Sequence, residues 1–216
     1  MIYKKYIAEF IGTFFLTLAV CMTTFSKVSA DVQPIAIGMT LMALIYSMGY
    51  MSGAHFNPAV TIGIWFRGRM DTKDAGIYIV AQLVGAAAAA LVSGVLISAK
   101  PQMIPVAISP PYFSMIPTLL AELIGAFALM WIVLNVATTK TLEGNNFYGI
   151  TIGLGITGLI YIFGSVSGSV FNPAVAVATC ITQFSSWQNI WIYLVGNIAG
   201  AALAAVLFKF INSDEA

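Results

Sequence analysis

The chain has few charged residues. Asp, Glu, Lys and Arg make up 8% of its 216 residues, whereas 60% are hydrophobic. About a quarter of the positions in a soluble domain carry charge, so this composition excludes an ordinary water-soluble fold. Nine basic and eight acidic residues nearly cancel, and the formal charge of +1 excludes a basic surface for nucleic acid. We therefore expect an integral, multi-pass membrane protein without a nucleic-acid partner.

Residues that bind metals or form disulfides are also scarce. Both cysteines, Cys21 and Cys180, lie inside apolar runs, so the sequence has neither a disulfide framework nor a CxxC metal site. The single histidine, His55, excludes a centre built from several histidines. We expect no metal and no cofactor. Because no nucleophile, base and orienting group are spaced to meet, we also expect no enzyme.

Charged residues divide the chain into five membrane-compatible stretches. Three of them, of 17, 17 and 25 residues, each match one helix of roughly 20 residues across a hydrocarbon core about 30 Å thick. The other two, of 35 and 65 residues, are too long for one and two crossings, and the surplus in each surrounds an Asn-Pro-Ala string. In chain order, the stretches are residues 10–26, 32–66, 75–99, 123–139 and 144–208.

Three elements recur in the same order at nearly one offset. The string Ala-Glu-Phe-Ile-Gly-Thr-Phe at Ala8 returns as Ala-Glu-Leu-Ile-Gly-Ala-Phe at Ala121, 113 residues later. The Asn-Pro-Ala string and the segments that begin at Tyr78 and Tyr193 recur at an offset of 115. The chain therefore contains a duplicated unit, with residues 1–110 as the first repeat and 111–216 as the second, within one structural domain.

Each repeat consists of two spans, an Asn-Pro-Ala segment and a third span. Because three crossings are an odd number, the second copy must enter the membrane from the opposite side, which makes the repeat inverted. The expected fold is all-α, with six transmembrane helices and two re-entrant half-helices.

The basic residues predict the orientation. Seven fall on one side of a six-span arrangement, and only Lys27 and Lys100 fall on the other. Since short cytoplasmic loops carry an excess of Lys and Arg, we expect both termini in the cytoplasm and the protein in the plasma (inner) membrane. The seven residues are Lys4, Lys5, Arg67, Arg69, Lys73, Lys140 and Lys209.

The two Asn-Pro-Ala strings each predict the start of a helix, because Asn is a strong N-cap and Pro is favoured at the first helical position. About ten apolar residues follow each string, roughly 15 Å of helix, which is half a membrane. The non-helical backbone before each string cannot face lipid, so it must be buried or line a wet cavity. The strings are Asn57, Pro58 and Ala59, and Asn172, Pro173 and Ala174.

Inverted symmetry brings the two helix starts together near the middle of the membrane. Two N-termini that face one point place about half a positive charge each there, which opposes cations but not neutral molecules. The amides of Asn57 and Asn172 can donate hydrogen bonds to a passing oxygen and interrupt a proton-conducting chain of waters. A lone Asn-Pro pair is often only a turn, but two at symmetric positions predict a pore for uncharged, hydrogen-bonding solutes.

With these motifs, the sequence resembles the aquaporin, or major intrinsic protein, family over essentially all 216 residues. The resemblance implies an hourglass fold, a pore through each protomer and a homotetramer in the lipid bilayer. It also implies a selectivity filter formed by Ile37, Ile160, Ser169 and Val175. Most relatives carry Arg where this chain has Val175, so we expect a wider and more apolar filter.

Glu9 and Glu122 occupy matching positions in the two repeats. Carboxylates inside a membrane can form a proton relay. Their symmetric placement instead favours a supporting role, in which they accept hydrogen bonds from the backbone of the re-entrant loops. We expect His55, two residues before Asn57, to pack against its loop or to lie at the pore mouth.

These features predict a passive channel for water and small neutral solutes such as glycerol, urea, ammonia, hydrogen peroxide or neutral metalloid acids. A strict water channel is the main alternative. The resemblance does not decide between them, because Ala176, Cys180 and Tyr193 look like the water-channel type and Leu194 like the glycerol type. A coupled secondary transporter and a junctional membrane protein are further alternatives.

Overall fold

The computed structural model describes residues 3–26, 29, 31–98 and 114–213. In this part of the chain every regular element is a helix. The long helices are α1 (Lys4–Phe25), α2 (Gln33–Ser52), α4 (Thr72–Ser98), α5 (Met115–Thr138), α6 (Tyr148–Ser167) and α8 (Ile190–Ile211). The short ones are α3 (Pro58–Phe66) and α7 (Pro173–Ile181), with the 3-10 turns η1 (Lys140–Leu142) and η2 (Trp187–Asn189).

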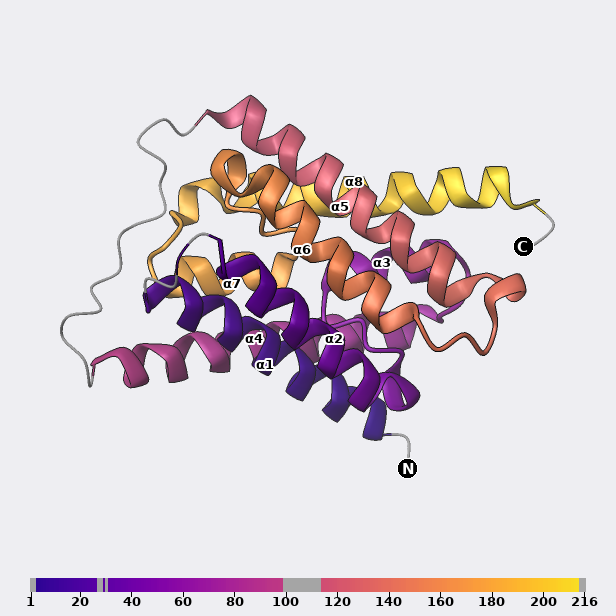
Figure 1. Ribbon diagram of the computed structural model, residues 1–216, viewed down its shortest axis with the longest axis horizontal. Coiled ribbons are helices and arrows are strands. Elements are labelled where there is room, and N and C mark those ends of the chain that lie inside the picture. Colours follow the sequence, from indigo (N-terminus) through magenta and orange to yellow (C-terminus); the bar gives the residue numbers. More distant parts are fainter. Residues whose placement is uncertain (1–2, 27–28, 30, 99–113, 214–216) are drawn as a thin grey trace.

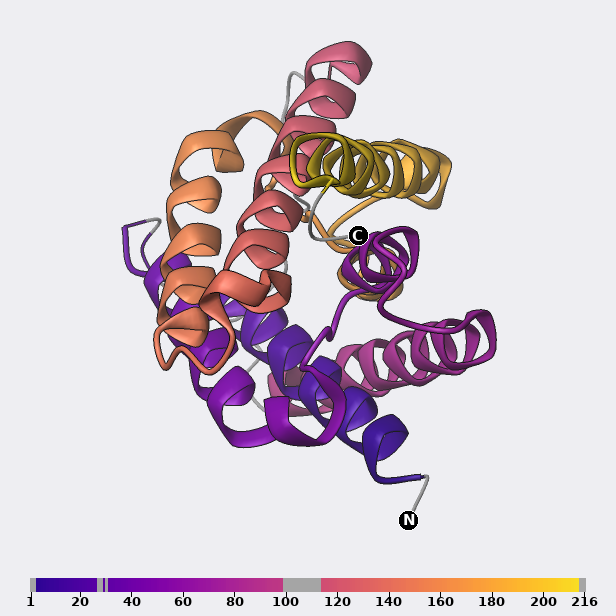
Figure 2. The same cartoon turned by 90° about the vertical axis from the view of Figure 1, so that its right-hand side faces the viewer.

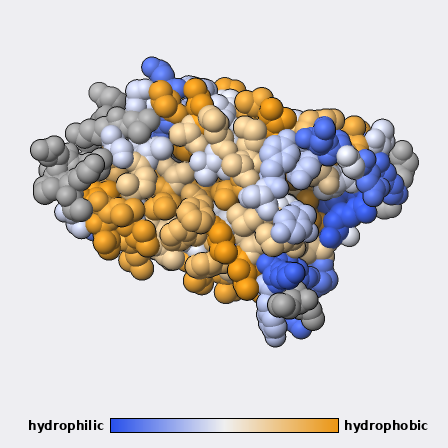
Figure 3. Space-filling view, turned by 60° about the horizontal axis from the view of Figure 1, so that its bottom comes forward, coloured by the Kyte–Doolittle hydropathy of each residue, from blue (hydrophilic) through white to orange (hydrophobic). Residues whose placement is uncertain are grey.

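Among the described residues, six helices are long and apolar enough to cross a membrane: α1, α2, α4, α5, α6 and the segment Trp187–Ile211, which contains α8. A helix satisfies its own backbone amides and carbonyls, as lipid requires. Figure 3 shows hydrophobic side chains over the middle of the molecule and hydrophilic ones gathered at one end. The predicted all-α membrane fold with two half-helices is confirmed.

The helices pack in matching pairs. In the first half of the chain α1 packs along α4, and in the second half α5 packs along α8. The two halves meet where α2 packs against α6. Each half-helix also contacts the last helix of the other half, α3 with α8 and α7 with α4. The halves therefore interlock, and neither half-helix has to face lipid alone.

Figure 1 shows that α1 begins and α8 ends at the same end of the molecule, which we call the terminal end. The half-helix α3 lies towards the terminal end, and α7 lies in the opposite half. In Figure 2, which looks along the long axis, α3 and α7 overlap, and the two are in contact. They therefore lie end to end near the axis of the molecule.

Some sequence predictions fall outside the described residues. Lys27 and Lys100, the two basic residues expected on the side away from the termini, are among them. So is the boundary between the proposed repeats at residues 110 and 111.

Candidate functional site

Both half-helices begin as the Asn-Pro-Ala strings predict. The Asn57 side-chain oxygen accepts a hydrogen bond from the backbone N–H of Ala59 at 2.8 Å. The Asn172 oxygen accepts from Ala174 N at 2.9 Å and from Val175 N at 3.5 Å. A proline follows each asparagine as the first helical residue. Each asparagine thus satisfies N–H groups that a helix start leaves without a partner.

The two asparagines also tie the half-helices to each other. Asn57 Nδ2 donates to the carbonyl oxygen of Phe171 at 2.9 Å, and Asn172 Nδ2 donates to the carbonyl oxygen of Phe56 at 3.0 Å. A side-chain amide has two N–H donors, and this crossing bond uses one of them. The second N–H of each amide can therefore serve a molecule beside the asparagine.

The loops before the asparagines have an unusual backbone. Gly53 and Gly168 end α2 and α6 at φ of 83° and 84°, where a residue without a side chain is favoured. Four non-glycine residues follow at left-handed φ, each at a cost of about 1–2 kcal/mol. They are Ala54 (54°), Phe56 (50°), Ser169 (53°) and Phe171 (46°). Something in the surroundings must hold this conformation.

A buried carboxylate holds the first loop. Glu9 Oε1 accepts hydrogen bonds from Ser52 Oγ at 2.7 Å and His55 N at 3.0 Å. Glu9 Oε2 accepts from Phe56 N and from Gln82 Nε2, both at 2.7 Å. Glu9 is fully buried. Its charge is stabilised by four donors that would otherwise lie in an apolar interior without a partner.

A second carboxylate holds the second loop in the same way. Glu122 Oε1 accepts from Ser167 Oγ at 2.7 Å and Val170 N at 2.9 Å, and Oε2 accepts from Phe171 N at 2.8 Å. Neither Glu122 nor Glu9 is among the residues that line the cavity described next. This geometry suits carboxylates that support the loops, rather than groups that exchange protons with the cavity.

A cavity of about 1040 Å³ passes both asparagines. Its wall extends from Asp31, which precedes α2, to Arg69, which follows α3, and Lys140 in η1. Both loops and both half-helices contribute to the wall. The structure therefore places the two Asn-Pro-Ala strings around a long passage through the molecule.

The four residues of the predicted filter all line this cavity: Ile37, Ile160, Ser169 and Val175. The side chains of Ile37, Ile160 and Val175 are apolar. The hydroxyl of Ser169 donates a long hydrogen bond of 3.5 Å to the carbonyl oxygen of Ile160. The residue that follows the second Asn-Pro-Ala string, Val175, carries no charge.

His55 also lines the cavity, next to the first half-helix. Its Nδ1 lies 3.1 Å from Thr61 Oγ1, which accepts a further hydrogen bond from Gln82 Nε2 at 2.9 Å. The His55 and Tyr78 rings are 5.3 Å apart. The His55 side chain therefore contacts Thr61 in α3 and Tyr78 in α4, and His55 also borders the cavity.

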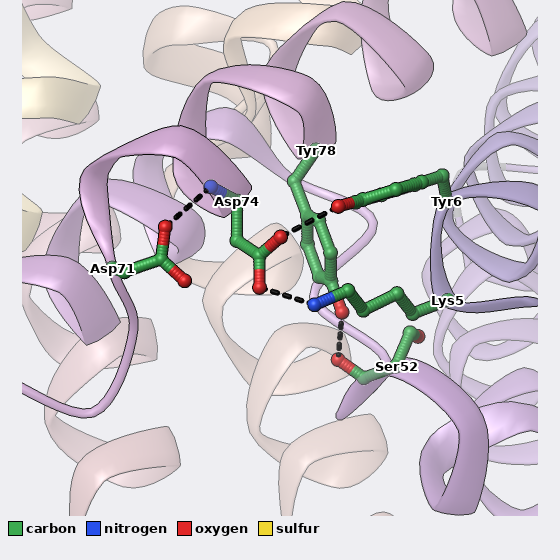
Figure 4. A network of polar contacts seen from close by, with 6 residues as sticks. All are labelled: Lys5, Tyr6, Ser52, Asp71, Asp74 and Tyr78. Atoms are coloured by element: carbon green, nitrogen blue, oxygen red, sulfur yellow. Dashed lines mark hydrogen bonds and ion pairs between the residues drawn. The ribbon is translucent and has the colours of Figure 1, made fainter. Parts of the chain in front are cut away.

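One polar cluster near the first loop was not predicted. Figure 4 shows Asp74 between Lys5, with which it forms an ion pair, and Tyr6, whose hydroxyl donates to it at 2.6 Å. The Tyr78 hydroxyl donates to the carbonyl oxygen of Ser52 at 2.9 Å. One part of it repeats in the sequence, because Tyr193 lies 115 residues after Tyr78. The Tyr193 hydroxyl donates to the carbonyl oxygen of Ser167 at 3.2 Å, as the Tyr78 hydroxyl does to Ser52.

Comparison with known proteins gives concordant results. A family model described as "Major intrinsic protein" matches residues 1–208. A probable NIP-type aquaporin of Nicotiana alata is 34% identical over 226 residues, which covers 100% of this chain and 80% of the relative. The aquaporin AqpM of Methanothermobacter thermautotrophicus is 32% identical over 244 residues, with 98% of both chains covered.

A solved structure shares the fold. The X-ray structure of an aquaglyceroporin from Plasmodium falciparum matches with a TM-score of 0.87 and covers 100% of this chain and 99% of that one. The sequence identity between the two is 21%. This likeness concerns the arrangement of the helices.

Proposed function

The chain belongs to the major intrinsic protein family, and from that premise we propose that it is a passive transmembrane channel for water and small neutral solutes. The observation that carries the proposal is the meeting of α3 and α7 at Asn57 and Asn172, beside a cavity that passes both. We propose no catalytic activity. The named relatives are aquaporins, and the solved structure of like fold is an aquaglyceroporin.

The two helix N-termini supply the selectivity against cations. Each places about half a positive charge at its start, and the two starts are tied together by crossing hydrogen bonds. A neutral solute pays no electrostatic penalty there and can accept a hydrogen bond from each asparagine. Half-helix dipoles of this kind oppose protons and cations in aquaporin-type pores generally.

Val175 makes the proposed filter permissive. A unit positive charge about 4 Å from a passing cation opposes it by roughly 4 kcal/mol at an effective dielectric constant near 20. That corresponds to about a thousandfold in rate, so its absence leaves the helix N-termini as the main barrier to cations. With Ile37 and Ile160 opposite, the filter is apolar. We propose that it passes water and solutes such as glycerol, urea, ammonia, hydrogen peroxide or neutral metalloid acids.

The assignment of the filter is tested by Val175→Arg in proteoliposomes. We expect the variant to slow glycerol and urea uptake by about tenfold or more, and water less, because a guanidinium narrows an apolar opening. Val175→Thr keeps the shape and adds a hydroxyl but no charge, so it should change solute uptake less than Val175→Arg. Unchanged solute uptake in Val175→Arg would place the filter elsewhere.

The wild-type protein distinguishes the alternatives in the same assay. Facilitated water flux without glycerol, urea or ammonia flux would indicate a strict water channel. Flux that saturates, or that depends on an ion gradient, would indicate a coupled transporter. We do not expect strict water selectivity, because Ile37, Ile160 and Val175 make the filter apolar. We do not expect a coupled transporter, because the buried carboxylates Glu9 and Glu122 hold the loops and do not line the cavity.

We further propose the orientation and assembly that the sequence predicts. Both termini would lie in the cytoplasm, with the protein in the plasma (inner) membrane and assembled as a homotetramer. The distribution of basic residues supports the orientation, since Arg69 follows α3 and Lys140 follows α5, on the side of the six spans where the termini are expected. Residues 1–110 and 111–216 would be two repeats of one structural domain, as the matching order of α1–α4 and α5–α8 suggests.

A further inference from the structure

The internal repeat extends to the wall of the cavity. Each residue of the predicted filter has a partner at an offset of 115, and every partner also lines the cavity. We call the filter residues the filter ring and their partners the counterpart ring. The pairs are Ile37 with Ile152, Ile160 with Ile45, Ser169 with Ala54 and Val175 with Val60.

The two rings are built from equivalent positions. Val60 is the third residue of α3, as Val175 is of α7, and each follows its own Asn-Pro-Ala string. Ala54 and Ser169 occupy the same place in their loops, at φ of 54° and 53°. The backbones that present these side chains are therefore the same in both halves.

The rings lie on opposite sides of the asparagines. Along α2, Ile37 belongs to the filter ring and Ile45 to the counterpart ring, and eight residues correspond to about 12 Å of helix. Along α6 the order is reversed: Ile152, of the counterpart ring, comes first in the chain, and Ile160, of the filter ring, follows eight residues later. Since α3 points towards the terminal end and α7 away from it, the counterpart ring lies on the terminal side of the asparagines.

The chemistry of the two rings is almost identical. Three of the four pairs are Ile with Ile or Val with Val, and the fourth exchanges Ser169 for the smaller and apolar Ala54. Val60 is 6% exposed and Val175 is 4% exposed, so both are confined to the wall of the passage. A valine after both Asn-Pro-Ala strings removes the charge that would otherwise distinguish the two halves.

We propose that Ile45, Ala54, Val60 and Ile152 form a second selectivity filter, in series with the first. This inference rests on the proposed channel function and deepens it. A solute must lose water at both apolar rings, and neither ring offers a charged side chain in return. Small, uncharged solutes are therefore selected twice rather than once.

Two similar barriers in series predict a quantitative signature. One additional methylene in an apolar pocket changes discrimination by about tenfold. If both rings resist equally, Val60→Leu and Val175→Leu should each slow glycerol and urea by about fivefold, and the double variant by about tenfold. A single filter at Val175 predicts instead that Val60→Leu has no effect.

Substitution by a smaller residue distinguishes a second filter from a general distortion of the protein, because a distorted channel should not conduct faster. Val60→Ala and Val175→Ala should each speed the same solutes by at most about twofold, because the other ring still resists, whereas the double variant should exceed that limit. Val80→Leu is the matched control, since Val80 is 60% exposed on the outer surface of α4. It should conduct like the wild type.

The experiment is stopped-flow light scattering on proteoliposomes, with fluxes normalised to the amount of inserted protein. Water permeability is measured on the same vesicles, so that a channel restricted to water still tests both rings. The inference is overturned if both Val60 variants match the wild type while the Val175 variants do not. No facilitated flux of water or solute in the wild type would instead overturn the proposed function and, with it, this inference.

Discussion

The two re-entrant loops, residues 53–57 and 168–172, share one backbone but differ in the side chains around them. The glycines that open them have φ of 83° and 84°. The asparagines that close them form crossing bonds of 2.9 and 3.0 Å. This agreement shows that the loop conformation is the feature that both halves need, whatever packs behind it.

The polar support behind the loops is richer in the first half. There Glu9 accepts from four donors, and Gln82 also donates to Thr61. In the second half Glu122 accepts from three donors, Ala176 replaces Thr61, and the buried amide of Asn197 lies near Glu122 without a hydrogen bond of ordinary geometry within the described residues. One carboxylate, one serine hydroxyl and two backbone N–H groups are therefore common to both loops, and the first loop has additional stabilising contacts.

Removal of the carboxylates should have the largest effect. Glu9→Ala leaves four buried donors without an acceptor and Glu122→Ala leaves three, at about 1–3 kcal/mol for each donor. We expect both variants to give little folded protein and Glu9→Ala to give less. Size-exclusion chromatography and thermal unfolding in detergent measure this. An equal loss in both would show that the Gln82 contact adds nothing to the first loop.

The contacts beneath the phenylalanines should be equal in the two halves. A Cβ on Gly12 would lie 2.0 Å from Phe56 Cε1, and one on Gly125 would lie 2.0 Å from Phe171 Cε1. Gly12→Ala and Gly125→Ala should therefore each cost about 1–3 kcal/mol through overpacking. Gly76→Ala, where the added Cβ meets nothing within 4 Å, is the control. Clearly unequal losses of thermal stability would contradict the backbone symmetry.

The hydroxyl of Thr61 should matter less than the carboxylates. Thr61→Val keeps the shape and leaves Gln82 and His55 without their shared partner, so we expect a loss of about 1–2 kcal/mol in the free energy of unfolding. Thr40→Val is the control, because the Thr40 hydroxyl bonds only the carbonyl of Ala36 within its own helix. A similar loss of stability in both variants would show that the Thr61 hydroxyl does not support the first loop.

The ion pair at the terminal end should have the smallest effect. Lys5 and Asp74 are partly exposed, and such pairs contribute about 0–1 kcal/mol. We expect Asp74→Asn to lower thermal stability slightly and to leave the ratio of glycerol to water permeability unchanged. A changed ratio would show that the Asp74 cluster affects permeation through Tyr78 and Ser52. The two halves would then differ in function more than we propose.

The sequence predicted the parts of the site that depend on local chemistry. Asn followed by Pro fixes a helix start, so α3 and α7 begin at the residue after each asparagine, as expected. The spacing of charges fixes the spans. The offset of 115 also identified equivalent residues in the two halves. These features need only neighbouring residues or a repeated pattern.

Contacts between distant residues were not predictable in the same way. Tyr6 and Asp74 are 68 residues apart, and Asn57 and Phe171 are 114 apart. Polarity alone does not say which buried side chains will meet once the helices have packed. Gln82 shows this clearly, because it lies inside the repeated segment and its bond to Glu9 became visible only in the packed structure.

The central claim is that two half-helices meeting at Asn57 and Asn172 border a pore for uncharged molecules. The most direct test is the rate at which proteoliposomes with the wild-type protein take up glycerol over a wide concentration range, without any ion gradient. We predict a rate well above that of empty vesicles that rises in proportion to concentration. A rate equal to that of empty vesicles for both glycerol and water would contradict the claim.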